Sequence, residues 1–144
     1  MVRDLGVPPR TEQVPLLVAR IATALWAIPI AHVVETLRPL AFGPADHEIF
    51  VGNSVIRGIA TPVLDGGTLL GASSVPTRCV VLRFGEERRG VLVDEVVGVR
   101  TIAAAALGGY PGLPQTAAGE RVRTVDPAFA RVLATARLLP ELPA

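Results

Sequence analysis

The chain contains no lysine, and each of its 14 basic residues is an arginine. A lysine is required by phosphate-binding loops of the Walker type and by enzymes that form a Schiff base with their substrate. The composition therefore excludes these two mechanisms. The charges also nearly cancel, at a net charge of +1. Since binding to nucleic acid or to an anionic lipid surface usually needs a large positive excess, we expect neither partner.

Groups that bind metals or form disulfides are scarce. Cys79 is the single cysteine, so no internal disulfide is possible, and the N-terminus lacks the charged and then apolar pattern of a signal peptide. We therefore expect a reducing, cytoplasmic location. His32 and His47 are the two histidines, and neither has metal-ligand spacing with the other or with Cys79. We expect no metal and no cofactor, and a Cys79 that acts as a small buried hydrophobe within the apolar residues 79–82.

Aromatic residues make up only 4% of the chain, whereas half of the residues are hydrophobic. The core must therefore be aliphatic. One apolar run, residues 14–34, is long enough to span a bilayer. However, Pro15 and Pro29 bracket it and Arg20 lies inside it, where a charge is costly. Buried strands are the better interpretation, so we expect no direct membrane insertion.

Short apolar stretches separated by turn residues predict a mostly β protein with about seven strands. We expect a flexible arm at residues 1–13 and a single domain over residues 14–144, divided near residues 71–77 into two strand-rich halves. The predicted strands are residues 14–21, 25–30, 49–64 (interrupted by glycines), 78–84, 90–102 and 122–125. The predicted helices are residues 31–38 and 128–139, the second begun by an Asp126 cap and Pro127, and residues 103–120 are predicted to be a long loop.

Three charged residues near strand ends offer one possible ligand site. Asp65 and Asp94 each end an apolar string, and Arg57 lies within a predicted apolar strand. One hypothesis is therefore a small all-β ligand-binding or enzymatic barrel that uses Arg57, Asp65 and Asp94 to hold an anion. Against it, nothing in the sequence places these residues together, and acids at strand ends commonly cap turns.

Arg57 itself has two further interpretations. A charged side chain in an apolar strand must reach solvent, a carboxylate or a partner protein, because an unpaired buried charge is costly. Arg57 can form a structural ion pair with Asp65 or with Glu35. Alternatively, it can contact a partner at an interface, where arginine is enriched.

Four strings, in order, resemble the CheW-like adaptor family of bacterial chemotaxis over residues 14–140. They are residues 25–35, the pair Phe50-Val51-Gly52 and Ile56-Arg57-Gly58, the string Pro62-Val63-Leu64-Asp65, and Val80-Val81-Leu82 with Gly90-Val91-Leu92-Val93-Asp94-Glu95-Val96. The resemblance implies two interlocked SH3-like five-stranded barrels, with a short helix after the first hairpin and a C-terminal helix. It also implies a non-enzymatic adaptor that joins the cytoplasmic tip of a methyl-accepting chemoreceptor to the histidine kinase CheA. By motif position, the receptor-binding residues in the groove between the barrels are Val33, Arg57, Val81, Gly90 and Val96.

The resemblance is weakest near the C-terminus. Family members carry a strand hairpin before the last helix, and that hairpin helps to contact the kinase. Here residues 119–127 lead directly into the predicted helix, so the hairpin is shortened or lost. We therefore expect receptor docking to be retained and coupling to CheA to be weak.

Overall fold

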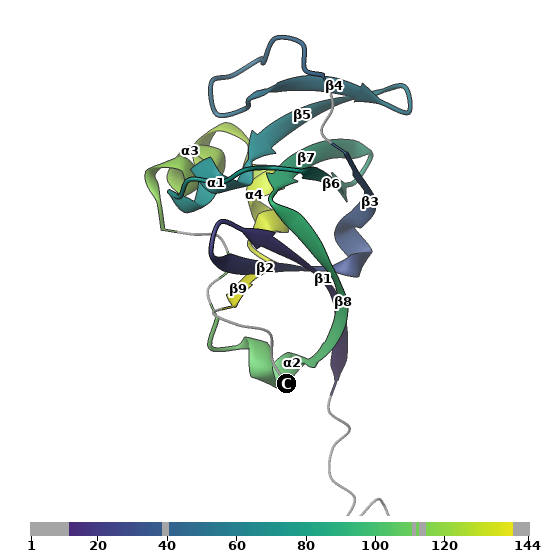
Figure 1. Ribbon diagram of the computed structural model, residues 1–144, viewed down its shortest axis with the longest axis vertical. Coiled ribbons are helices and arrows are strands. Elements are labelled where there is room, and N and C mark those ends of the chain that lie inside the picture. The colour runs from purple at the N-terminus through teal and green to yellow at the C-terminus, as the bar shows by residue number, and fades with distance from the viewer. Residues whose placement is uncertain (1–11, 39–40, 111, 113–114, 140–144) are drawn as a thin grey trace, which may run out of the picture.

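The computed structural model describes residues 12–38, 41–110, 112 and 115–139. Within them the chain forms an antiparallel sheet and a second sheet that contains one parallel pair of strands (Figure 1). The first sheet has the strand order β8-β1-β2-β9 and the second the order β3-β6-β7-β5-β4. The strands are β1 (Gln13–Ile21), β2 (Ala24–Pro29), β3 (Val33–Leu37), β4 (Gly52–Ile56), β5 (Ile59–Asp65), β6 (Arg78–Phe84), β7 (Glu87–Val93), β8 (Glu95–Ala103) and β9 (Arg137–Leu139). The helices are η1 (Ile30–His32), α1 (Gly66–Leu70), α2 (Ala104–Leu107), α3 (Ala117–Val125) and α4 (Pro127–Leu133).

The two sheets interlock because the chain leaves the first sheet and later returns to it. After β1 and β2 the chain builds all of the second sheet, β3 to β7, and then comes back as β8 and β9. Residues 71–77 lie between β5 and β6, which belong to the same sheet, so that segment does not separate the two sheets. The second sheet has the predicted five strands, and the first has four among the described residues. Of the predicted arm at residues 1–13, all but the last two residues lie outside the described part of the chain.

The predicted opening hairpin is confirmed, but the helix predicted at residues 31–38 is wrong. A short 3-10 turn, η1, is followed by the strand β3, which pairs with β6. A register shift between Val33 and Glu35 places both Val34 and Leu37 against the same buried cluster. A bulge thus produces the i, i+3 spacing that is otherwise typical of a helix face. The β-branched residues of this segment agree with the strand.

The C-terminal region differs from its prediction in three places. Residues 122–125, predicted as a strand with a free edge, belong to the helix α3, in which Val122 is fully buried. The hydroxyl of Thr116 accepts a hydrogen bond from the amide of Gly119 and so caps this helix. The loop predicted at residues 103–120 contains α2 and the start of α3. The last helix is capped by Asp126 as predicted, but it ends at Leu133, and β9 follows and pairs with β2.

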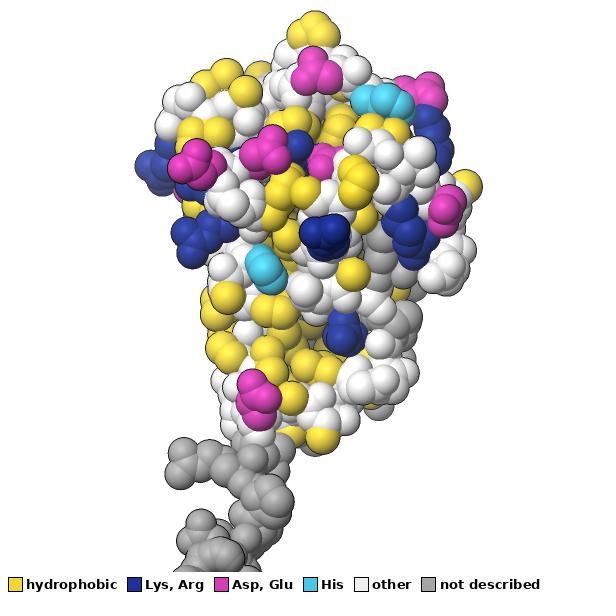
Figure 2. All heavy atoms as spheres, turned by 180° about the vertical axis from the view of Figure 1, so that it is seen from behind, with side chains coloured by type: hydrophobic (Ala, Val, Ile, Leu, Met, Phe, Trp, Pro, Cys, Tyr) yellow, Lys and Arg dark blue, Asp and Glu magenta, His cyan; other side chains and the backbone are white. Residues whose placement is uncertain are grey.

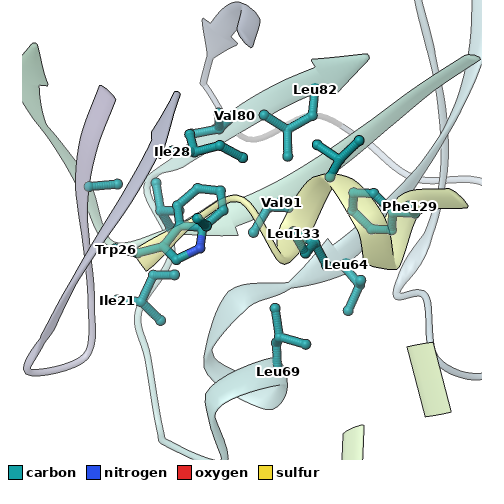
Figure 3. Close-up of a cluster of buried hydrophobic side chains, with 14 of the residues drawn as sticks. Ile21, Trp26, Ile28, Leu64, Leu69, Val80, Leu82, Val91, Phe129 and Leu133 are labelled. Carbon is teal, nitrogen blue, oxygen red and sulfur yellow. The ribbon is translucent and has the colours of Figure 1, made fainter. Parts of the chain in front are cut away.

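The buried side chains form three clusters, as the alternation along the strands requires. In β6, Val80 and Leu82 face the main cluster between the two sheets, whereas Cys79 and Val81 face a separate cluster on the other side of the second sheet. A third cluster lies on the outer side of the first sheet. Figure 3 shows the main cluster, in which Trp26 from β2 and Phe129 from α4 lie among aliphatic side chains. The aliphatic core expected from the composition is confirmed.

No helix in the described part of the chain is both long enough and apolar enough to cross a membrane. The apolar run at residues 14–34 forms β1, β2 and the start of β3. The interpretation of this run as buried strands is therefore confirmed.

Candidate functional site

Arg57 lies in a turn at the end of the second sheet, not within a strand as the sequence predicted. Arg57 and Gly58 are the two residues that connect β4 to β5, and their φ angles are +51° and +78°. Positive φ at both central positions is the mark of a type I′ turn, whose twist suits a tight hairpin. The turn exposes the side chain of Arg57, which is 75% accessible.

The side chain of Arg57 forms a two-point ion pair with Glu35 of β3. Its Nε lies 2.7 Å from Glu35 Oε2, and its Nη2 lies 3.0 Å from Oε1. This geometry confirms an ion pair with Glu35 and excludes the alternative pairing with Asp65. The hydrogen bonds from Arg57 lower the pKa of the Glu35 carboxyl and raise the pKa of the Arg57 guanidinium. In Figure 1 the turn between β4 and β5 lies on the same side of the molecule as β3.

Two other predicted site residues lie in a row beneath this ion pair. Val81 of β6 is paired with Glu35 on one side and with Gly90 of β7 on the other. Val81 is only 1% exposed, and Gly90 is also buried. The sheet therefore brings Arg57, Val81 and Gly90 together through Glu35, but of the three only Arg57 presents a side chain to solvent.

Val33 and Val96 lie where the two sheets meet. Val33 is in β3, two residues before Glu35, and Val96 is in β8 of the first sheet. Both are partly buried and pack against the main cluster between the sheets. The packing against the core fixes the position of each valine, and part of each apolar side chain remains accessible to solvent.

Glu35 is the residue that the predicted site lacks. Glu35 is one of the two ion-pair partners that the sequence offers for Arg57, but it is not among the predicted binding residues. Glu35 is the single acidic residue in the string 25–35, and this isolation among apolar neighbours was the available signal. Its partner was uncertain because Arg57 is 22 residues away in the sequence.

Asp65 and Asp94 have structural roles. Asp65 Oδ2 accepts hydrogen bonds from the amide and hydroxyl of Thr68, at 3.2 and 2.8 Å, and so caps α1. The two carboxylate oxygens of Asp94 accept from the amides of Ala22 and Val75, each at 3.1 Å. Asp94 therefore joins the turn between β1 and β2 to the loop that precedes β6.

The anion-binding alternative is not supported by this arrangement. Arg57 precedes the first residue of β5 and Asp65 is its last residue, so about 20 Å of extended chain separates them. Asp94 lies near the Asp65 end, because Asp65 is paired with Leu92. In the described ranges, no three His, Cys, Asp or Glu side chains are grouped so that they would hold a metal ion.

Cys79 is a buried hydrophobe, as the sequence predicted. It is 1% exposed, and its burial raises the pKa of the thiol to about 11. The thiolate, which is the nucleophilic form, is therefore scarce at neutral pH.

A hollow of about 470 Å³ lies on the helices α3 and α4. Its lining includes Arg123 and Arg131, and it does not include the ion pair of Arg57 and Glu35.

The face of the molecule in Figure 2 carries more charged side chains over one half than over the other. Figure 2 shows charged side chains gathered over the upper half of the molecule, which holds the second sheet. Hydrophobic side chains are more frequent over the lower half, which holds the first sheet. The ion pair therefore belongs to the charged half of the surface.

Two comparisons identify the class of protein. The fold is similar to that of the scaffolding protein TtCheW from Thermoanaerobacter tengcongensis, with a TM-score of 0.60 and 22% identity over 74% of this chain and 75% of that one. The model of the CheW-like domain family matches residues 15–142. The chain therefore belongs to the CheW-like domain family. No curated protein sequence matches the chain.

Proposed function

We propose that this chain is a cytoplasmic adaptor that docks on the tip of a methyl-accepting chemoreceptor through the surface around Glu35 and Arg57. Family membership supports an adaptor role. The observation that carries the location is the two-point ion pair at an exposed turn. Docking at this surface needs no catalytic group.

The ion pair prepares Arg57 for binding. Two of its nitrogens are held by Glu35, while the side chain as a whole remains 75% exposed. A partner that contacts it therefore meets a side chain whose conformational freedom is already reduced, which lowers the entropic cost of association. The backbone at Arg57 has a positive φ, which disfavours residues other than glycine. An arginine at such a position suggests that its side chain is needed for function.

Val33 and Val96 provide the apolar part of the proposed surface. A receptor tip is a helical hairpin, and a helix binds by laying its apolar face along an apolar groove. Val33 and Val96 lie at the meeting of the two sheets, and each keeps part of its apolar side chain accessible to such a helix. Val81 and Gly90 are proposed to act indirectly. They are buried in the strands next to Glu35 and so fix the position of its backbone.

We further propose that coupling to the kinase CheA is weak. In place of the expected C-terminal hairpin the chain has α3 and α4, which contact the hairpin of β6 and β7 at two points. Arg89 Nε of β7 lies 2.7 Å from Asp126 Oδ2 at the junction of the two helices. Phe84 stacks against Phe129 with ring centroids 6.1 Å apart. A kinase surface that binds a strand hairpin would therefore bind weakly at this place, because the chain presents helices there.

The test is a calorimetric titration with a soluble, coiled-coil hairpin of a receptor tip from the organism that encodes this chain. We expect saturable binding by the wild type and none by Arg57→Glu, which places two carboxylates side by side. Arg131→Glu is the matched control, because Arg131 is an exposed arginine on α4. Absence of binding by the wild type, or equal binding by Arg57→Glu, would contradict the proposal.

Titration with the purified kinase CheA tests the second proposal. We expect binding much weaker than receptor binding. Grafting a full strand hairpin over residues 119–127 should strengthen it. Tight binding of the kinase by the wild type would show that α3 and α4 do not prevent coupling.

A further inference from the structure

Two arginines face each other across the hairpin formed by β6 and β7. Arg83 of β6 is paired directly with Arg88 of β7. Like charges at directly opposed positions of an antiparallel pair repel one another and destabilise the sheet. Neither arginine forms an ion pair within the part of the chain that the structure describes. Among the described residues, the repulsion is therefore relieved by no direct ion pair.

Both arginines project from the same face of the second sheet as Glu35 and Val81, opposite the face on which Val33 packs. Side chains alternate along a strand, so Arg83 shares a face with Val81, and Arg88 shares a face with Gly90. Val81 and Gly90 are the pair next to Glu35, and two residues of strand correspond to about 7 Å. The charge of Arg88 also contributes to lowering the pKa of Glu35, in agreement with this placement.

The acidic side chains nearby do not neutralise this arginine pair. Glu35 is already bound at two points by Arg57. Glu87, in the same hairpin, lies 3.8 Å from Arg89 and is otherwise exposed. Glu86 is exposed in the turn and forms no ion pair in the described ranges. The face around Glu35 therefore carries an excess of positive charge.

We propose that Arg83 and Arg88 form a subsite for an acidic side chain of the docked receptor helix. This inference rests on the proposed function and names the chemistry of the partner at one point of the interface. Two guanidinium groups on neighbouring strands can donate to the two oxygens of one carboxylate. Binding would also remove the repulsion between the arginines, so the interaction gains from both effects. Arg83 and Arg88 thereby select receptor tips that carry an Asp or Glu at this point.

The first experiment compares Arg83→Gln/Arg88→Gln with the wild type by calorimetric titration of the receptor-tip hairpin at several salt concentrations. We expect the affinity to fall about tenfold, as for loss of hydrogen bonds to a charged group. The dependence of affinity on salt should also weaken, because fewer charges meet at the interface. Arg131→Gln, which removes one exposed positive charge from α4, should leave the affinity and its salt dependence unchanged.

A second experiment identifies the contact directly. Arg88→Glu should lose most of its affinity for the hairpin. In a panel of hairpins in which each acidic residue is changed in turn to arginine, one variant should restore binding to Arg88→Glu. Failure of every variant to restore binding would overturn the inference.

The outcomes separate this inference from the proposed function. If the wild type binds the hairpin and the double glutamine variant binds equally well, the inference is overturned and the docking proposal stands. If the wild type does not bind, both are overturned. The thermal midpoint of the double variant should stay the same or rise, because the repulsion between two facing positive charges is removed. A clear fall would assign the arginines a structural role and overturn the inference.

Discussion

Gly90 of β7 lies directly against the sulfur of Cys79. A Cβ atom added at Gly90 would stand 2.8 Å from the Sγ of Cys79 and 3.1 Å from a methyl carbon of Val63. Both distances are shorter than ordinary van der Waals contacts. The neighbouring strands β5 and β6 therefore close over position 90, and only a glycine fits between their side chains. This packing sets the spacing of the sheet beneath the proposed docking surface.

Gly90→Ala should lower the free energy of unfolding by about 1–3 kcal/mol, because an additional methyl group overpacks the cluster. Cys79→Ala removes the sulfur and should recover part of this loss in the double variant. Urea denaturation of the two single variants and the double variant measures the coupling. Additive effects would contradict the contact. If Gly90→Ala remains folded, its affinity for the receptor tip should fall, because the methyl group shifts the strands beneath the proposed docking surface.

Arg57→Gly should leave the fold intact, since glycine favours the positive φ of the turn. The pKa of Glu35 should then rise toward its usual value, because the largest cause of its lowering is the hydrogen bond from Arg57. NMR titration of the Glu35 carboxyl measures this change. Arg88→Gln is the matched comparison and should raise the pKa by less. An unchanged Glu35 pKa in Arg57→Gly would show that the pair does not persist in solution.

The same ion pair predicts the direction of a pH effect on stability. The pKa of Glu35 is lower in the folded state than in the unfolded state, so its contribution is complete above the unfolded pKa of about 4.3 and is lost as the pH falls through the folded value. The difference in unfolding free energy between the wild type and Arg57→Gly should therefore be constant above about pH 5 and shrink in more acidic solution. Urea denaturation at a series of pH values checks this. A difference that grows with acidity would contradict it.

Asp94→Ala should destabilise the protein by about 2 kcal/mol, because two amides lose a charged acceptor. The amides are those of Ala22 and Val75, which the carboxylate holds together. Glu95→Ala provides a control at the next position, since Glu95 forms an exposed ion pair with Arg20. That variant should cost about 0.5 kcal/mol or less. Equal effects of the two substitutions in urea denaturation would show that Asp94 does not join these segments.

The thiol of Cys79 should be unreactive in the folded protein at neutral pH. Its pKa is raised to about 11 by burial, and the side chain is 1% exposed. Reaction with Ellman's reagent should be negligible in buffer and rapid in concentrated denaturant. The labelling rate in intermediate denaturant then reports opening of the second sheet. Rapid labelling of the native protein would indicate that this cluster is accessible.

Several local features were correctly predicted because they depend on neighbouring residues. The turn between β1 and β2 separates two apolar strings, and the hairpin of β6 and β7 has a charged connection. The cap at Asp126 was also predicted, since an aspartate before Pro127 favours the start of a helix. In each case the residues that determine the turn or the cap lie within a few positions of one another in the sequence.

The incorrect predictions concern segments whose conformation depends on distant partners. Residues 31–38 have helical spacing, but β3 exists because β6, more than 40 positions later, provides its hydrogen bonds. The β-branched residues around Val122 suggest a strand, yet α3 forms because Val122 fits the main cluster and Thr116 caps the helix. The family resemblance nevertheless assigns the proposed site residues, since the motif positions do not depend on the conformation of each segment.

The sequence by itself determined that the core is aliphatic, that lysine chemistry is absent, and that the fold is mostly β with short strands. These properties follow from composition and local alternation. Only the tertiary structure decided that Arg57 binds Glu35, that Asp94 joins two distant turns, and that Arg83 faces Arg88. The physical reason is that strand pairing brings together residues far apart in the chain, with a register set by bulges and buried contacts. The proposed docking surface is made of such pairs.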